Sequence, residues 1–100
     1  MAAIVWAPRA LDDLEALVEY IARDSQVHAK RFAARIFHRV ESLASQPDSG
    51  SWLPEDDCGI YRQIFQNPYR IIYRHDQEEV LIVAVHHAAR LLGSDDLQRG

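Results

Sequence analysis

The sequence predicts an α+β fold with an N-terminal strand, an antiparallel helical hairpin and a three-stranded antiparallel meander, all in one sheet with the helices packed on one face. Two observations support this prediction. Apolar residues recur every three or four positions through the first half of the chain, and β-branched and aromatic runs replace that pattern after Cys58. The two apolar helix faces have no surface to bury them except the sheet, so we expect both helices on the same side of it.

The first strand is expected at residues 3–7, where Ile4 and Trp6 give the apolar and aromatic content of a buried strand. Pro8 ends this run and suits the first turn of a helix, because the N–H that proline lacks has no partner there in any case. We predict the helix over about residues 8–23. Its apolar residues recur at helical spacing and its acidic residues occupy the opposite side: Leu11, Leu14, Leu17, Val18 and Ile21 against Asp12, Asp13, Glu15 and Glu19.

The second helix gives the strongest periodic signal, and we predict it over about residues 26–46. Ser25 is suited to cap its first turn and Pro47 to end it, after which residues 47–57 are expected to form a polar loop. The short connection between the helices predicts an antiparallel hairpin. The outer side of this helix carries a basic stripe, which is typical of a solvated face: His28, Arg31, Arg35, His38 and Arg39.

The meander is predicted from three runs at residues 59–65, 69–74 and 80–85, separated by Asn67-Pro68 and by a polar turn. The last run is continuously apolar, which indicates a strand covered on both faces or central in the sheet. We expect the first strand to pair at or near this last one. The middle runs carry arginines, so they are expected to be solvated on one face.

Length and composition favour a single domain over residues 1–100, because 100 residues of which 48% are apolar can bury one core. The one cysteine is Cys58, so we expect no disulfide within the chain and no cysteine pair for zinc. A net charge of −4 excludes a global attraction to nucleic acid or anionic lipid. No stretch resembles a signal peptide or a membrane span, so we expect a cytoplasmic protein, without metal or cofactor.

Several segments resemble the RelE/ParE superfamily of type II toxins, in the order found in that family. The stretch Trp6-Ala-Pro-Arg-Ala-Leu-Asp-Asp-Leu14 is similar to its opening helix, and Ala29-Lys-Arg-Phe32 to its second helix. The resemblance spans about residues 3–91 and points to the ParE-like branch, whose members include plasmid stabilisation proteins. The segments that resemble its three C-terminal strands are Tyr61-Arg62, Tyr69-Arg-Ile-Ile-Tyr-Arg74 and Val83-Ala-Val-His-His-Ala-Ala-Arg90.

Three arginines, Arg62, Arg70 and Arg74, lie on neighbouring predicted strands, where a tight hairpin would bring at least two of them within reach of each other. Clustered guanidinium groups can hold a phosphate, but they can equally pair with a carboxylate of a partner or of the same chain. The hairpin register does not follow from the sequence, so which arginines share a face is open. His86 and His87 point to opposite faces, because side chains alternate along a strand.

The resemblance implies that His87 and Arg90 are the pair carried over from the ParE branch. Together with the three strand arginines they are the candidates for contact with the target or the antitoxin: Arg62, Arg70, Arg74, His87 and Arg90. For a nuclease of the superfamily, the candidates would be Arg62, Arg70 and Arg90. Cleavage also needs a general base and a general acid. Ala88 and Ala89 stand where YoeB-like nucleases place a catalytic His and Tyr, and the acidic residues 55–57 are expected to be solvated loop charge.

Three functions compete at this point. The first is a ParE-like toxin that inhibits growth by binding a cellular target, by family analogy DNA gyrase, and that is neutralised by a cognate antitoxin of the ribbon-helix-helix type with a disordered tail. The second is a RelE-like mRNA endonuclease that works on the ribosome. The third is a decayed member that folds and binds its partner without toxicity, since a fold does not fix a function.

Overall fold

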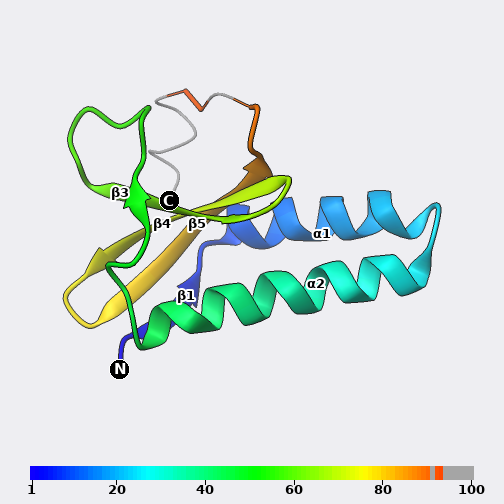
Figure 1. The fold of residues 1–100 in the computed structure, drawn as a ribbon, viewed down its shortest axis with the longest axis horizontal. Coiled ribbons are helices and arrows are strands. Elements are labelled where there is room, and N and C mark those ends of the chain that lie inside the picture. The colour runs from blue at the N-terminus through cyan, green and yellow to red at the C-terminus, as the bar shows by residue number, and fades with distance from the viewer. Residues whose placement is uncertain (91, 94–100) are drawn as a thin grey trace.

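The computed structural model describes residues 1–90, 92 and 93, and it confirms the predicted α+β class. The helical segments are α1 (Pro8–Ala22), α2 (Gln26–Glu41) and a short 3₁₀ turn, η1 (Ser42–Ala44). The strands are β1 (Ala3–Trp6), β2 (Ser51–Trp52), β3 (Tyr61–Gln66), β4 (Tyr69–Asp76) and β5 (Glu79–His87). The helices form a hairpin along one side of the sheet (Figure 1).

The two helices begin as predicted, but the second ends early. Pro8 occupies the first turn of α1, and the Ser25 hydroxyl accepts a hydrogen bond of 3.2 Å from the amide of His28 at the start of α2. The α2 helix ends at Glu41, before the predicted end at residue 46. The Ser42 hydroxyl donates to the carbonyl of Arg39 at 2.6 Å, which competes with the helical backbone bonds and tightens the chain into η1.

The sheet is mixed, with the strand order β1-β5-β4-β3-β2. β1 runs parallel to β5, with Ala3 opposite Glu79, so the first strand lies beside the last as predicted, and the other neighbours are antiparallel. The expectation that residues 47–57 form only a loop is wrong, because they contain β2. This strand has only two residues and pairs Ser51 with Gln63. It is defined by its backbone hydrogen bonds, because two residues are too few to show an apolar alternation.

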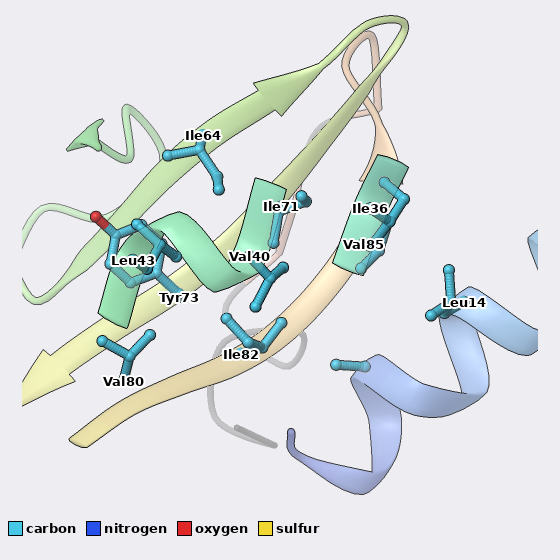
Figure 2. Packing of buried hydrophobic residues seen from close by; sticks show 11 residues of the cluster. Leu14, Ile36, Val40, Leu43, Ile64, Ile71, Tyr73, Val80, Ile82 and Val85 are labelled. Atoms are coloured by element: carbon cyan, nitrogen blue, oxygen red, sulfur yellow. The ribbon is translucent and has the colours of Figure 1, made fainter. Parts of the chain in front are cut away.

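The helices and the sheet enclose the larger apolar cluster, shown in Figure 2. α1 contributes Ala10 and Leu14, and the other buried side chains come from α2, η1 and the three long strands. Each helix therefore buries its apolar face against the sheet, which is the arrangement that two one-sided helices require. The fully buried members with the largest side chains are Tyr73, Ile36, Leu43, Ile71, Ile82, Val40, Val80 and Val85.

The face of the sheet that points away from the helices is also partly covered. Leu53 and Leu92 pack there against Ile72 and against Val83 and Ala84 of β5. The last strand is therefore covered on both faces, as its continuous apolar run predicted. Two adjacent residues of β5 share this face because the register slips between Ile72 and Tyr73, which makes Val83 the extra residue of a bulge.

No helix within the described residues is long and apolar enough to span a bilayer.

Candidate functional site

The three candidate arginines of the β3–β4 hairpin are divided between the two faces of the sheet. The register places Arg62 opposite Tyr73, whose ring is buried on the helix side, so Arg62 lies on that side too. Arg70 and Arg74 alternate with the residues of the helix side and lie on the opposite face. The structure therefore forms no three-membered guanidinium cluster.

Arg62 binds the turn that precedes β2. Its Nη1 donates to the carbonyl of Gly50 at 2.9 Å and to the carbonyl of Asp48 at 3.2 Å. The guanidinium carbon lies 3.8 Å from the centre of the Trp52 ring, within the range of a cation–π interaction. Arg62 therefore stabilises the turn before β2 and the pairing of β2 at the edge of the sheet.

Arg70 is buried, with 4% of its surface exposed, so the expectation of a solvated face is wrong at this position. Its Nη1 donates to Glu55 Oε1 at 2.9 Å and to Gln63 Oε1 at 3.1 Å. Its Nη2 donates to Glu55 Oε2 and to the carbonyl of Arg90. This two-pronged pairing with a carboxylate compensates the cost of burying the guanidinium charge.

Glu55 is the partner that the sequence did not reveal, and the expectation that it is solvated loop charge is wrong. The hydrogen bonds from Arg70 lower the pKa of this carboxyl below its ordinary value of 4.5; burial opposes the shift, and the amide of Leu92 reinforces it by donating to Oε2 at 3.0 Å. Glu55 is therefore an ionised and weakly basic group. Together, Arg70 and Glu55 hold the 53–60 segment and the end of the described chain against the sheet.

The two histidines at the end of β5 lie on opposite faces, as predicted. His86 is buried and accepts a hydrogen bond of 3.0 Å at Nδ1 from Nη1 of Arg90, whereas His87 is exposed and its ring stands edge-on to Tyr69 at 5.9 Å. His87 and Arg90, the two residues that the resemblance carries over, are joined through the backbone, because the amide of Arg90 donates to the carbonyl of His87 at 3.0 Å, while the turn directs the Arg90 guanidinium toward His86. The Nδ1 of His87 instead accepts from the amide of Ala89 at 3.1 Å.

Asp13 also belongs to this end of the sheet, although the sequence placed it on the outer side of α1. Its Oδ2 accepts a hydrogen bond of 3.0 Å from the amide of Val85 and lies 3.7 Å from Nε2 of His86. The strand β1 pairs with β5 only as far as Ile82, so Asp13 satisfies an amide that no neighbouring strand reaches. An open pocket of about 280 Å³ lies beside these residues and Arg90.

A second loop carboxylate, Asp56, orders the segment between β2 and β3. Desolvation disfavours its charged form, but hydrogen bonds from the amides of Tyr61, Ile60 and Cys58 outweigh that effect and lower the pKa of Asp56. The expectation of a solvated charge is wrong here as well. The third acid of this loop, Asp57, is exposed as predicted.

The remaining candidates among the described residues lie apart from the Arg70–Glu55 pair. Arg74 is half-buried and makes no hydrogen bond or ion pair with residues 1–90, 92 or 93, and it is separated from the Arg70–Glu55 pair by Ile72. Over the same residues, no group of three or more acidic, histidine or cysteine side chains is placed to hold a metal ion. No sequence signal could have found Glu55, because its partner lies 15 positions away in another element.

A helical hairpin on one face of a five-stranded mixed sheet agrees with the fold expected of the RelE/ParE superfamily. The chain belongs to the family described as ParE toxin of type II toxin-antitoxin system, parDE, whose match covers residues 4–92. It is thus the toxin component of a type II toxin–antitoxin pair, a class that has a cognate antitoxin as its partner.

Individual relatives fall in both branches of the superfamily. The chain is 37% identical over 91 residues to Toxin RelE2 of Caulobacter vibrioides, a match that covers 91% of this chain and 100% of that protein. Among solved structures, the chromosomal ParDE TA system from P. aeruginosa has a TM-score of 0.73 at 20% identity, covering 87% of this chain and 96% of the other. The YoeB dimer from Staphylococcus aureus has a TM-score of 0.61 at 16% identity, covering 86% and 95%. These two structural similarities concern the fold alone.

Proposed function

We propose that this toxin inhibits growth by binding a cytoplasmic target, by family analogy DNA gyrase, without cutting RNA, and that its cognate antitoxin neutralises it. The observation that carries the proposal is the pairing of Arg70 with Glu55. A nuclease needs a cation free to contact the phosphate of its substrate, and here Arg70 is buried with both terminal guanidinium nitrogens bonded to Glu55, Gln63 and a backbone carbonyl.

The proton-transfer groups that cleavage requires are also unfavourable. Glu55 has a lowered pKa, so it is a poor general base for a ribose hydroxyl. Ala88 and Ala89 follow β5 and carry no group that can donate or accept a proton. His87 is exposed, but its Nδ1 is engaged by the amide of Ala89. A loss of general acid–base help typically reduces a rate by about 10² to 10⁴, which would leave cleavage below a useful level.

The contact surface for the target is proposed at the exposed end of β5, where His87 and Arg90 are exposed. Arg70 supports this surface from within, because it donates to the carbonyl of Arg90. Arg62 and Arg74, which the sequence also suggested for contact, lie toward the other end of the β3–β4 hairpin and are proposed as separate contacts. Arg74 is partly exposed and makes no hydrogen bond or ion pair within the described residues, whereas Arg62 donates to the carbonyl of Gly50.

The antitoxin is proposed to be of the ribbon-helix-helix type, with a tail that folds on the toxin. An apolar groove between α1 and α2, with Val18, Ala22, Ala29 and Ala33 among its lining residues, suits an amphipathic helix. The outer edge of β1 is the other place where a strand of the tail can add to the sheet. Calorimetry with the product of the neighbouring gene should give tight binding and a negative heat-capacity change; the absence of binding would contradict this part.

The RelE-like nuclease is the second candidate, favoured by the name of the relative RelE2 and by the fold shared with YoeB. A non-toxic member that keeps only the antitoxin interaction is the third. The test is induction of this protein alone in bacteria, followed by primer extension on a reporter mRNA and, with purified protein, a gyrase supercoiling assay. We expect growth arrest, no codon-phased cuts and inhibited supercoiling.

The variants His87→Ala and Arg90→Ala should weaken the arrest, whereas Asp57→Asn, in an exposed loop position, serves as the control. Codon-phased cuts with supercoiling unchanged would establish the nuclease instead. Normal growth at verified expression, with no effect in either assay, would support the non-toxic member.

A further inference from the structure

The α2 helix carries a straight row of cationic and imidazole side chains on the flank that faces away from α1. His28, Arg31, Arg35 and His38 follow one another at intervals of three, four and three residues, which places them along a single line on a helix. At about 1.5 Å per residue the row is about 15 Å long. We call these four residues the α2 row. It is the basic stripe that the sequence assigned to a solvated face.

The side chains of the α2 row are available for contact with another molecule. All four residues are exposed, and the side chains of Arg31 and Arg35 form no hydrogen bond or ion pair with any residue that the structure describes. The helix has one acidic residue, Glu41, at its last position. Arg39 is excluded from the row, because its Nε donates to the carbonyl of Phe65 at 3.2 Å and Nη1 to Ser42 Oγ at 3.1 Å. The row is thus a local positive surface on a protein of net charge −4.

The chemistry of the row fits a polyanion better than a protein segment. A protein helix needs apolar area to bind, and the apolar groove of this hairpin lies on the other flank, toward α1. Beside the cations the row exposes Ala34 and Val27; Val27 is 58% exposed, but these two small side chains offer little apolar area. Evenly spaced guanidinium groups suit phosphates that repeat along a backbone. The Phe32 ring of the same helix packs edge-on against Tyr69 at 5.0 Å, so it presents no stacking platform for an unpaired base.

We infer that the α2 row is a contact surface for the phosphate backbone of duplex DNA, read without sequence preference. The α2 row is an observation on the helix and does not depend on the proposed function. The choice of duplex DNA over double-helical RNA does rest on the proposed function, because duplex DNA is the substrate of gyrase. Such a contact would add to the affinity of the toxin for a gyrase–DNA complex.

The test is fluorescence anisotropy of the isolated protein with a 25-base-pair labelled duplex of mixed sequence (about 2.5 turns at 10–10.5 base pairs per turn) at several salt concentrations. We expect weak binding, with a Kd of about 10⁻⁴ to 10⁻⁶ M, and a logarithmic salt slope that falls by about 1 in Arg35→Gln and by about 2 in the double variant Arg31→Gln/Arg35→Gln. Lys30→Gln is the matched control: it removes one positive charge from the same helix on the flank that lines the groove with α1.

If Arg35→Gln and Lys30→Gln reduce the salt slope of duplex binding equally, the effect is one of general charge and the inference is overturned. No duplex binding at low salt, or tighter binding of a single strand or of an RNA duplex, would overturn it as well. Circular dichroism of each variant verifies folding, which glutamine should preserve because it is a good helix former. The assay contains no gyrase, so its failure is distinguishable from a failure of the supercoiling test.

Discussion

The hydroxyl of Tyr73 and the amide of Gly50 are joined by a buried hydrogen bond of 2.9 Å. The same hydroxyl donates to the carbonyl of Pro47 at 2.8 Å, so one side chain of β4 holds both ends of the turn that leads into β2. Burial raises the pKa of Tyr73 above its ordinary value, which keeps the hydroxyl protonated and able to donate. The position of β2, and with it that of the Glu55 loop, depends on this contact.

Replacement of Tyr73 by phenylalanine should therefore destabilise the protein although the ring is retained. The amide of Gly50 and the carbonyl of Pro47 would lose their partner, and an unsatisfied buried group costs about 1 to 3 kcal/mol. Urea unfolding followed by circular dichroism measures the change in the free energy of unfolding. Tyr20→Phe is the control: Tyr20 is 65% exposed, so its replacement should leave the free energy of unfolding unchanged. Equal stability of Tyr73→Phe and the native protein would contradict the prediction.

Gly50→Ala should also destabilise the protein, because the turn has no room for a side chain. A Cβ atom at this position would lie 2.6 Å from the Tyr73 hydroxyl and 2.7 Å from the carbonyl of Gln63, and both neighbours are fixed. Overpacking of this kind typically costs about 1 to 3 kcal/mol. Gly59→Asn tests the contrast: nothing lies within 4 Å of a Cβ there, and asparagine tolerates the positive φ of 67°. If Gly50→Ala and Gly59→Asn have the same free energy of unfolding, the close approach of atoms at Gly50 does not limit the stability of the protein.

The Arg70–Glu55 pair should make stability depend on pH in the acidic range. Because the pKa of Glu55 is lower in the folded state, the pair stabilises the fold fully above the ordinary value of 4.5, and this contribution is lost as the pH falls through the lowered value. Glu55→Gln removes the titrating group, so the difference in the free energy of unfolding between native protein and variant should shrink as the pH falls below 4.5. A difference that stays constant from pH 7 to pH 3 would refute this assignment.

Arg70→Ala should destabilise the protein more than Glu55→Gln, because alanine also removes the donors to Gln63 and to the carbonyl of Arg90, whereas glutamine keeps an acceptor for Arg70. Breaking a buried ion pair by removing one partner costs about 3 kcal/mol or more. Chemical denaturation of both variants at pH 7 gives the comparison, and Arg74→Ala on the same face is the control, since it makes no ion pair within the described residues. If Arg70→Ala and Arg74→Ala lose the same free energy of unfolding, the pairing of Arg70 with Glu55 is not the cause of the destabilisation.

Most of the fold followed from the sequence because periodic apolar patterns report burial directly. The two helices, the meander and the opposite orientations of His86 and His87 needed only local spacing. By contrast, β2 and the partners of Arg70 depend on which distant segments meet. Glu55 resembles any loop acid until the chain is folded, and its role is set by a guanidinium group from another strand.

The candidate site was predicted less completely for the same reason. Sequence analysis identified Arg70 and Arg90 as residues of interest, and the structure brings the carbonyl of Arg90 to the guanidinium of Arg70. The contact between Arg90 and His86 did not follow from the sequence, because the direction of a side chain after a strand ends depends on the turn. That turn is fixed by backbone bonds, including one of 2.8 Å from the amide of Ala88 to the carbonyl of Pro68.

The parallel pairing of β1 with β5 bears on how the toxin matures during translation. β1 is the first strand to be synthesised and its neighbour β5 is the last, since Ala3 lies opposite Glu79 and Trp6 opposite Ile82. The helical hairpin can form early from local contacts, but its apolar faces stay uncovered until β5 emerges, because contacts between distant segments form late. The sheet of a nascent chain therefore stays incomplete for most of its synthesis, and β1 gains its neighbour only once β5 has been made.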